Sequence, residues 1–451
     1  MLQEKTSSGL FFCLSLLTIL AEVLELEVLA DIAICLALGF LVLEFRSIGR
    51  LPKIIGSSLL ILGAGLAFYE HSLVDLIHTG LRKTLPFLLL FASVTWLQAP
   101  SSYSPSLLNV RRYVVNQPSG RRFLFLSFAA HLLGAAFNLA SFSLLSPMIK
   151  HVNDPNTKSR LVRAMSFGFG TATCWSPFFV GTVIVLSLVP KAPWTDVAPY
   201  GISIGLVLLL LGWMFDRIYF RKNHEAYQAT ATPARFQITP FLKTLLVLSL
   251  LFASVILVSE TLHWKISISL AVVAPIFSLI WLLTISTKEK LRVPTIIYED
   301  IFKNFRSLRG ETFLFMSANI FGVCFSSFIQ HTPLDIQDTL ASLSPHVTLI
   351  LIMVSFLFTS AIGLHPVIYV VVLTSILSPE NTGIPPLIFA LCLISMWGQG
   401  TNISPLSATV IYLSGVTKQS NFKIAWRWHS PFSLLASIMI AIILQLLLLI
   451  Q

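Results

Sequence analysis

Apolar runs of about 20 residues recur along the whole of this 451-residue chain. An α-helix needs a run of that length to cross the hydrocarbon core of a bilayer, which is ~30 Å thick. Only 11% of the residues are charged, whereas soluble globular domains contain about 25%. The sequence therefore predicts an all-α polytopic membrane protein, integral to the membrane and crossing it many times.

The runs divide into two kinds. Eleven predict single transmembrane helices, near 9–26, 30–45, 54–69, 85–98, 160–189, 199–216, 240–258, 265–284, 312–329, 385–413 and 430–450. Two more, 123–149 and 346–378, are long for one straight crossing and carry small or helix-breaking residues halfway, in GAAFN (134–138) and GLHP (363–366). Each of these two predicts a re-entrant hairpin, which enters the membrane, turns and leaves on the same side.

The basic residues support this topology. The first hairpin has Arg121 and Arg122 before it and Lys150 and Lys158 after it, so both its ends are expected in the cytoplasm. The second is flanked by the acidic residues Asp335, Asp338 and Glu380, so both its ends are expected outside. Of the 30 Lys and Arg residues, the arrangement then leaves outside only Arg82, Lys83, Lys191 and Lys265. It predicts a cytoplasmic N-terminus and an external C-terminus in the plasma membrane, or the inner membrane of a bacterium.

Other classes of protein are disfavoured. The net charge of +10 lies in loops beside apolar runs, with no soluble basic domain that could bind nucleic acid. The five cysteines all lie within apolar runs without close spacing, which disfavours disulfides and metal knuckles. Zinc spacings and nucleotide-binding loops are not found, so we expect no cofactor and no structural metal. Glu22, Glu25 and Glu27 stand where a signal peptide would have small residues, so the first run is read as a span.

A repeated motif divides the chain into two halves. GTATCWSP (170–177) and GQGTNISP (398–405) share the pattern G-x-x-T-x-x-S-P at an offset of 228 residues (404 − 176 = 228). A hairpin precedes each copy, one span follows it, and the hairpins enter from opposite sides. The predicted organisation is an extra helix (1–27), a first inverted repeat (28–222), a cytoplasmic linker (223–239) and a second inverted repeat (240–451). Paired, interrupted segments in inverted repeats are typical of secondary transporters.

The residue types at the two interruptions predict a binding site. Proline opens a helix just before itself and glycine permits the unwound backbone, so carbonyl groups and helix N-termini are freed for a cation and an anion. The predicted site comprises Asn138, Ser141, Thr171, Thr173, Ser176, His365, Gln399, Thr401, Asn402 and Ser404. A coupling Na⁺ is expected near Asn138, Thr173, Thr401 and Asn402, unless His365 carries a coupling proton instead. His365 as a neutral histidine bonded to a backbone carbonyl is an equal alternative, and His131 is expected to be structural.

The layout resembles the ion transporter superfamily, which includes the divalent anion/sodium symporters. The resemblance covers nearly the whole chain: one span, then two inverted units of five spans and a hairpin. It implies that the hairpin tips and interrupted helices form the substrate and sodium sites, and that the protein is a homodimer. The Ser-Asn-Thr hairpin-tip signature of the dicarboxylate branch is absent, and GAAFN and GLHP stand in its place.

The sequence thus predicts a secondary active transporter, an ion-coupled permease for a small anionic organic solute that works by alternating access. It is not expected to be an enzyme. A polytopic membrane enzyme acting on a lipid-linked substrate is the alternative, which requires a cluster of acid–base residues at the membrane interface. A passive channel ranks last, because a channel needs no paired broken helices.

Overall fold

The structure is a computed structural model that describes residues 2–115, 117, 119–150, 152–220, 238–331 and 343–450. Over these residues the secondary structure is helical, without a strand. Ten helices among them are long and apolar enough to cross a membrane. The prediction of an all-α polytopic membrane protein is therefore confirmed. The predicted linker 223–239 lies almost wholly outside the described residues, as do Asp335 and Asp338.

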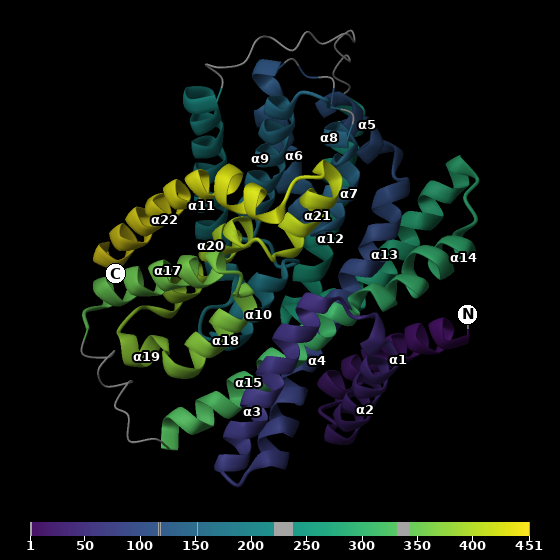
Figure 1. Ribbon diagram of the computed structural model, residues 1–451. Helices are drawn as coiled ribbons and strands as arrows, with labels where there is room; N and C mark the ends of the chain where they lie inside the picture. Colours follow the sequence, from purple (N-terminus) through teal and green to yellow (C-terminus); the bar gives the residue numbers. More distant parts are fainter. Residues whose placement is uncertain are drawn as a thin grey trace. The chain divides into compact units, whose positions relative to one another are not determined.

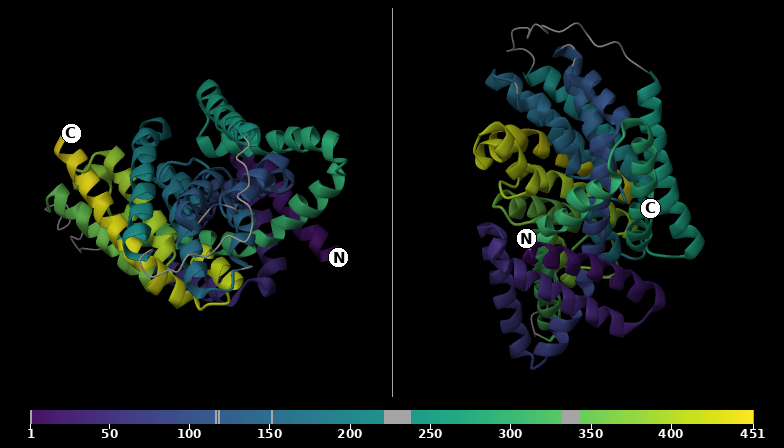
Figure 2. Two further views of the ribbon diagram at one scale, coloured as in Figure 1. Left: turned by 90° about the horizontal axis from the view of Figure 1, so that it is seen from above. Right: turned by 90° about the vertical axis from the view of Figure 1, so that its right-hand side faces the viewer.

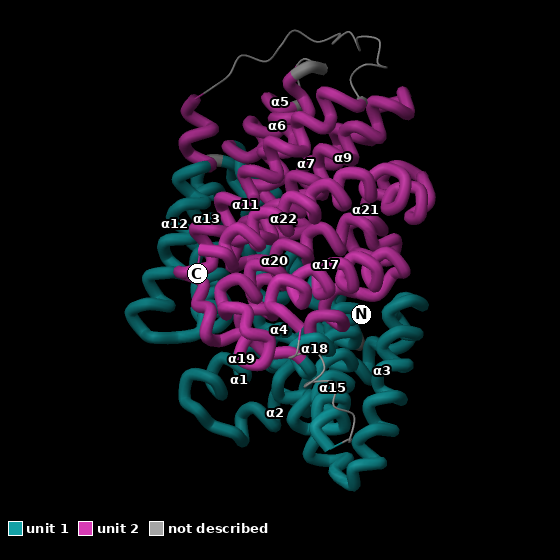
Figure 3. Tube along the Cα trace, turned by 90° about the vertical axis from the view of Figure 1, so that its left-hand side faces the viewer, with its two compact units in different colours: residues 1–105, 245–334, 371–376 teal, residues 106–244, 335–370, 377–451 magenta. Residues whose placement is uncertain are grey.

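The chain folds into two compact units, which Figure 3 colours separately. Unit 1 consists of 1–105, 245–334 and 371–376, and unit 2 consists of 106–244, 335–370 and 377–451. Each unit contains segments from both predicted repeats. The interrupted motifs and almost all of both predicted hairpins belong to unit 2.

Unit 1 is built from long apolar helices (Figure 1). They are α1 (Leu2–Leu24), α2 (Glu27–Glu44), α3 (Arg50–Tyr69), α4 (Leu73–Tyr103), most of α12 (Ile238–Leu262), α13 (Ile266–Glu289) and α15 (Arg309–His331), with the short η1 (Phe45–Ser47), α14 (Val293–Ile296), η4 (Ile297–Phe302) and η5 (Lys303–Leu308). Small residues allow α15 to pack closely on α3 and α4, because a β-carbon at Gly80 would lie 2.5 Å from the Cα of Ile320.

Unit 2 is built from shorter, frequently interrupted helices. They are α5 (Pro105–Val115), α6 (Ser119–Phe137), α7 (Ala140–Leu145), α8 (Pro147–Lys150), α9 (Pro155–Ala172), α10 (Val180–Leu188), α11 (Trp194–Phe215), η2 (Asp216–Phe220), α17 (Pro345–Ala361), the start of α18 (Pro366–Ile376), α19 (Pro379–Thr382), α20 (Pro386–Ile403), α21 (Ala408–Thr417), η6 (Lys423–His429) and α22 (Ser430–Ile450). The rest of α18, residues 371–376, belongs to unit 1. Helices α6 and α9 lie side by side along much of their length (Figures 1 and 2). Helix α20 packs on α9, α17 and α22.

Ten of the eleven predicted spans coincide with the ten long apolar helices. The eleventh, 160–189, is the interrupted pair α9 and α10. Helix α9 begins with the polar turn of residues 156–160 and is rich in small residues. It is therefore too polar, rather than too short, to count among the ten long apolar helices. Its interior position explains this composition, since residues 161–172 are all buried within unit 2.

Each predicted hairpin is a pair of short helices joined by a turn. In the first, α6 ends at Phe137 and α7 starts at Ala140. In the second, α17 ends at Ala361 and α18 starts at Pro366. Both α17 and α18 are apolar but shorter than a full crossing. The helix breaks therefore fall where the small and helix-breaking residues indicate.

The ion pairs agree with the predicted sidedness of the loops. On the predicted outer side Lys191 pairs with Glu380 at 2.6 Å within unit 2. In unit 1, Lys265 pairs with Glu22 and Arg82 pairs with Glu27, and both of these basic residues are predicted outside. On the predicted inner side Arg160 pairs with Asp216 at 2.7 Å. No pair among the described residues joins loops predicted on opposite sides, whereas which side is cytoplasmic stays a prediction.

The two interrupted helices of unit 2 cross at a pair of glycines. A β-carbon at Gly398 would lie 2.1 Å from the carbonyl oxygen of Gly170, and one at Gly170 would lie 2.8 Å from Nδ2 of Asn402. Gly170 and Gly398 are the first residues of the two motif copies. Equivalent positions of the repeat therefore meet backbone to backbone, at a distance that only glycine allows.

This contact predicts a stability difference between two glycines of unit 2. Gly398→Ala should destabilise the protein by ~1–3 kcal/mol, because the new methyl group overpacks the crossing. Gly415→Ala is the matched control: a β-carbon there meets nothing within 4 Å, and alanine favours a helix by ~0.5–1 kcal/mol over glycine. Thermal unfolding of the purified variants measures both. Equal melting temperatures for the two variants would contradict the close crossing.

Candidate functional site

The interruptions end at equivalent positions of the two motif copies, but the first begins three residues earlier in its copy than the second. Helix α9 ends at Ala172 and α10 starts at Val180, so the first break spans 173–179 and includes Pro177. Helix α20 ends at Ile403 and α21 starts at Ala408, so the second break spans 404–407 and includes Pro405. Each proline removes an amide donor and opens the helix just before itself, as predicted.

Threonine hydroxyls make equivalent hydrogen bonds at the two breaks. Oγ1 of Thr173 donates to the carbonyl of Gly170 at 2.7 Å, and Oγ1 of Thr401 donates to the carbonyl of Gly398 at 2.9 Å. The carbonyl of Thr173 accepts from Thr182 at 2.9 Å, while that of Thr401 accepts from Ser407 at 2.6 Å. The carbonyls predicted to be free for Na⁺ thus each hold one hydrogen bond, which leaves one lone pair on each oxygen.

The first hairpin tip is fastened to the first break. Asn138 has a φ of 50° and forms the turn between α6 and α7; asparagine tolerates this left-handed conformation better than most residues. Ser141 donates to the carbonyl of Asn138 at 2.8 Å. Ser176 donates through Oγ to the carbonyl of Ala135, three residues before the turn. The hydroxyl of Ser176 therefore ties the tip to the break.

The second hairpin tip lies against the second break. Gly363 has a φ of 104°, and a β-carbon there would lie 2.7 Å from Cδ1 of Leu406. Two residues later, Nδ1 of His365 accepts the backbone N–H of Val367 at 3.2 Å and so caps the start of α18. The ring of His365 lies 6.3 Å from that of Trp397, centre to centre. One ring nitrogen of His365 thus has a backbone amide as its partner. Whether this histidine carries a proton or is structural stays a prediction.

A chain of hydrogen bonds fixes His131 in its neutral form. The indole N–H of Trp175 donates to Nε2 of His131 at 3.2 Å, so this nitrogen carries no proton. Nδ1 then donates to Oγ1 of Thr171 at 2.9 Å, and Thr171 donates to the carbonyl of Gly168 at 2.8 Å. Thr171, a predicted site residue, is thereby engaged with α6 and α9, and Trp175 has a structural role.

Three of the four predicted residues of the second break differ from these, because polar atoms of their side chains have no partner among the described residues. Gln399 and Asn402 are at most 1% exposed, and neither atom of either amide group has a hydrogen-bond partner among the described residues. The hydroxyl of Ser404, also 1% exposed, is unpartnered in the same part of the chain. An unpaired buried amide costs on the order of 1–3 kcal/mol. Such a concentration of unpaired groups is what a site for a polar ligand requires.

Sequence reasoning missed three polar residues that lie near these amides. Ser166 on α9, His429 at the end of η6 and Ser433 on α22 are completely buried, and each has a polar atom without a partner in the described chain. Nδ1 of His429 donates to the carbonyl of Asn402 at 3.1 Å, which leaves Nε2 as an unpaired acceptor. The π-helical turn η6, a form enriched at functional sites, gives no recognisable sequence signal.

A buried charge lies at the same helix contacts. Arg163, one turn before Ser166 on α9, is 4% exposed and acts electrostatically on His429. Arg160, one turn before Arg163 on α9, forms a bidentate pair with Asp216 of η2. These three side chains carry two positive charges and one negative charge. The polar region of unit 2 therefore has a positive bias, which favours an anion over a cation.

The ten predicted residues thus all lie in unit 2, on seven segments of the chain. Tyr412 of α21 donates to Ser146 beside the first hairpin at 3.0 Å, so the hairpin of one half touches the broken helix of the other. Among the residues that the structure describes, no group of three or more His, Cys, Asp and Glu could hold a metal ion. The arrangement offers amide, hydroxyl and backbone groups for binding.

Comparison with known proteins places this geometry in context. No protein-family model and no curated protein matches the chain. The YdaH transporter of Alcanivorax borkumensis matches in structure, with a TM-score of 0.59 over 87% of this chain and 96% of that one. The chain has the fold of a membrane transporter. At 14% identity the likeness concerns the fold alone.

A second solved structure covers a similar share of the chain. MtrF of Neisseria gonorrhoeae, described as one of a class of antimetabolite efflux pumps, matches 87% of this chain and 93% of its own length at 12% identity and a TM-score of 0.48.

The two motif serines predict opposite effects on stability. Ser176→Ala should destabilise the protein by ~1–3 kcal/mol, because it leaves the buried carbonyl of Ala135 without its donor. Ser404→Ala should leave stability unchanged or raise it slightly, because it removes a buried hydroxyl that has no partner. The melting temperatures of the two purified variants test this pair. A Ser404→Ala variant as unstable as Ser176→Ala would show that Ser404 has a structural partner.

Proposed function

We propose that the protein is a secondary active transporter, an ion-coupled permease for a small anionic organic solute. The observation that carries the proposal is the crossing of two interrupted helices at Gly170 and Gly398, beside the buried, unpartnered amides of Gln399 and Asn402. A transporter fold adds support. The proposal includes the finer resemblance to the ion transporter superfamily, with two inverted repeats that expose the site alternately to each side.

The chemistry of the unpartnered groups supports an anion. The side-chain N–H groups of Gln399 and Asn402 are donors, and the hydroxyls of Ser166, Ser404 and Ser433 donate as readily as they accept. The first break also leaves the N-terminus of α10 without a side-chain cap, and its amides and dipole favour negative charge, whereas Ser407 caps the N-terminus of α21. A carboxylate has four acceptor sites, so it can take several of these donors at once.

The coupling ion in this proposal is Na⁺ or H⁺, and the oligomer is a homodimer. Na⁺ would find amide and carbonyl oxygens at Asn402 and Thr401, whose remaining lone pairs suit a hard cation. A symporter would bind the ion and the solute together, so each would raise the affinity for the other. Light scattering of the purified protein measures the mass of the assembly.

A ligand screen tests the proposal directly. Purified protein is melted with a panel of organic acids and their uncharged amides, in Na⁺ and in choline buffers and at two pH values. An organic acid present at 100 times its Kd should stabilise the protein by about 2.7 kcal/mol, whereas its amide should not. Asn402→Leu should abolish the effect. Stabilisation that is equal in wild type and Asn402→Leu would place the ligand elsewhere.

Transport by the same variants is the second readout. An acid found in the screen should be taken up into proteoliposomes by the wild type, and Ser404→Ala should slow its uptake without lowering stability. Uptake that Ser176→Ala and Ser404→Ala both leave intact would remove these serines from the site. Active transport would be contradicted if the solute only equilibrated across the membrane. In that case no imposed Na⁺ or H⁺ gradient would make the solute accumulate inside the proteoliposomes.

Unpaired buried amides in a binding site also lower the stability of the folded protein when no ligand is bound. Gln399→Met replaces the amide with an apolar group of similar volume, so we expect the ligand-free protein to gain on the order of 1 kcal/mol. The same variant should lose uptake. Met396→Leu, a buried apolar exchange one turn earlier on α20, is the control and should change neither. A destabilised Gln399→Met would show that the amide is hydrogen-bonded in the resting protein.

His365 offers a test of proton coupling. Because its Nδ1 accepts the N–H of Val367, His365→Asn can keep the cap with its side-chain oxygen but cannot take up a proton. We expect this variant to retain wild-type stability and the wild-type pH profile of uptake, and His365→Ala to lose ~1 kcal/mol of stability. A flattened pH profile in His365→Asn would instead identify His365 as the carrier of the coupling proton.

A further inference from the structure

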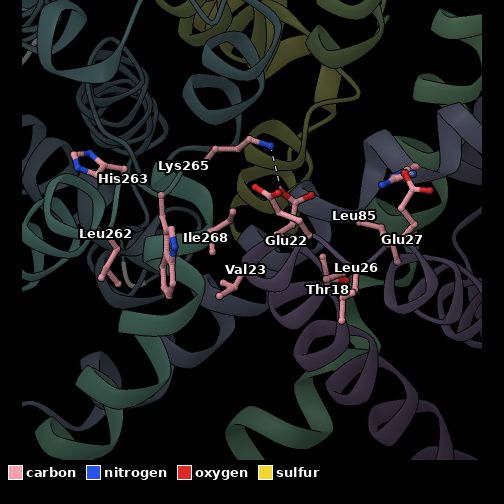
Figure 4. A pocket seen from close by; sticks show the side chains of 15 residues that line it. Thr18, Glu22, Val23, Leu26, Glu27, Leu85, Leu262, His263, Lys265 and Ile268 are labelled. Atoms are coloured by element: carbon pink, nitrogen blue, oxygen red, sulfur yellow. Dashed lines mark hydrogen bonds and ion pairs between the residues drawn. The ribbon is translucent and has the colours of Figure 1, made fainter.

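Unit 1 contains a cavity of about 700 Å³ at the predicted outer membrane interface. Its walls are the end of α1, the start of α2, the first half of α4 and the turn between α12 and α13 (Figure 4). Two left-handed residues, Glu25 with a φ of 54° and His263 with a φ of 54°, shape the two turns that line it. None of the residues of the proposed transport site belongs to this cavity.

Opposite charges line the cavity. Glu22, Glu25 and Glu27 contribute three carboxylates, and Arg82 and Lys265 contribute two cations, so one net negative charge remains. Lys265 pairs with Glu22 at 3.1 Å, as Figure 4 shows, and Arg82 pairs with Glu27 at 2.9 Å. Glu25 makes no ion pair with any residue that the structure describes. A ligand that suits these walls carries a cation for Glu25 and an anion for the basic side chains.

Apolar surface continues outward from the charged cavity. Leu262, Leu26 and Leu24 at its edge are each 50–55% exposed, and Leu20 one turn earlier on α1 is 46% exposed. Trp264 lines the cavity and is partly buried. Tryptophan prefers the boundary between lipid and water, where its ring is covered by lipid and its N–H is hydrated. The ligand should therefore be amphipathic, with its polar part in the cavity and its chains along the leucines.

We propose that this cavity binds the headgroup of a phospholipid that carries a primary ammonium, that is, a phosphoethanolamine headgroup. Its ammonium has three N–H donors for the carboxylates of Glu25 and Glu22. Its phosphate accepts from the guanidinium of Arg82 and the ammonium of Lys265. The acyl chains cover the exposed leucines of α1 and the end of α12.

The charges of the cavity discriminate between headgroups. Phosphatidylglycerol brings an anion without a cation, so the net negative charge disfavours it and Glu25 stays unpaired. Phosphatidylcholine brings a cation without N–H donors, so it cannot form the hydrogen bonds that a carboxylate accepts from an ammonium. The headgroup must compete with the two existing ion pairs for their charged side chains. Lys265, Glu27 and Arg82 are 70%, 75% and 44% exposed. Exposed ion pairs contribute at most about 1 kcal/mol, so this competition costs the ligand little.

Delipidated protein in detergent tests the proposal. Its melting temperature is measured with dioleoyl phosphatidylethanolamine, dioleoyl phosphatidylglycerol and dioleoyl phosphatidylcholine, which share their chains, and with soluble O-phosphoethanolamine. We expect the ethanolamine lipid to raise the melting temperature by on the order of 2–4 °C more than the other two lipids. Equal shifts with all three lipids would show non-selective lipid contact and overturn the proposal. A full shift with O-phosphoethanolamine alone would overturn the lipid as the ligand and leave a soluble amine.

Charge variants locate the effect. Glu22→Gln combined with Glu25→Gln should abolish the preference for the ethanolamine lipid, and Lys265→Gln should reduce it. Asp75→Asn, an exposed carboxylate of unit 1 on the same predicted side that does not line the cavity, is the matched control and should keep the whole preference. A preference that survives the double substitution, measured in protein that still melts cooperatively, would overturn the assignment to this cavity.

Discussion

A helix can break inside a bilayer only if its freed backbone groups find partners within the protein, because no water is available in the hydrocarbon core. Unit 2 meets this requirement with hydroxyl side chains. The carbonyls of Thr173 and Thr401 each receive a hydroxyl, from Thr182 and Ser407. Both breaks are thus stabilised by hydrogen bonds from uncharged hydroxyl groups close by in the sequence. The same bonds leave each of these carbonyl oxygens with a second lone pair.

The glycine crossing turns two local breaks into one region. Because Gly398 lies directly on the backbone of Gly170, neither helix can shift without moving the other. Each hairpin tip is also held by the break that follows it, through Ser176 in one half and Leu406 in the other. The hairpins, breaks and crossing therefore form a connected set within unit 2.

The sequence predicts those features that act locally. Pro177 and Pro405 lie within the two breaks, so the G-x-x-T-x-x-S-P copies locate both interruptions, and Asn138 and Gly363 locate both turns. Proline alone would not have sufficed, because Pro86, Pro199 and Pro275 stand inside continuous helices. Partners across helices are not predictable in this way. Ser176 and Ser404 occupy equivalent positions in the motif, yet the hydroxyl of Ser176 donates to the carbonyl of Ala135 and that of Ser404 has no partner in the described part of the chain. Ser166, His429 and Ser433 resemble ordinary helix residues in sequence, because only tertiary packing gathers them. The two compact units likewise cut across both repeats, since long-range helix contacts define them.

The difference between the equivalent positions carries the strongest functional information. At an offset of 228 residues, Gln399 corresponds to Thr171 and Asn402 to Cys174. Thr171 is engaged by His131, and Cys174 is fully buried with little capacity for hydrogen bonds. The second half instead places two amides with no partners among the described residues. The aromatic residues Phe169 and Trp397 also occupy equivalent positions of the repeat and are at most 4% exposed, yet their neighbours differ. Phe169 packs on Phe142 and Phe179, whereas Trp397 lies beside His365 and Gly181, so tertiary packing distinguishes even these matched positions.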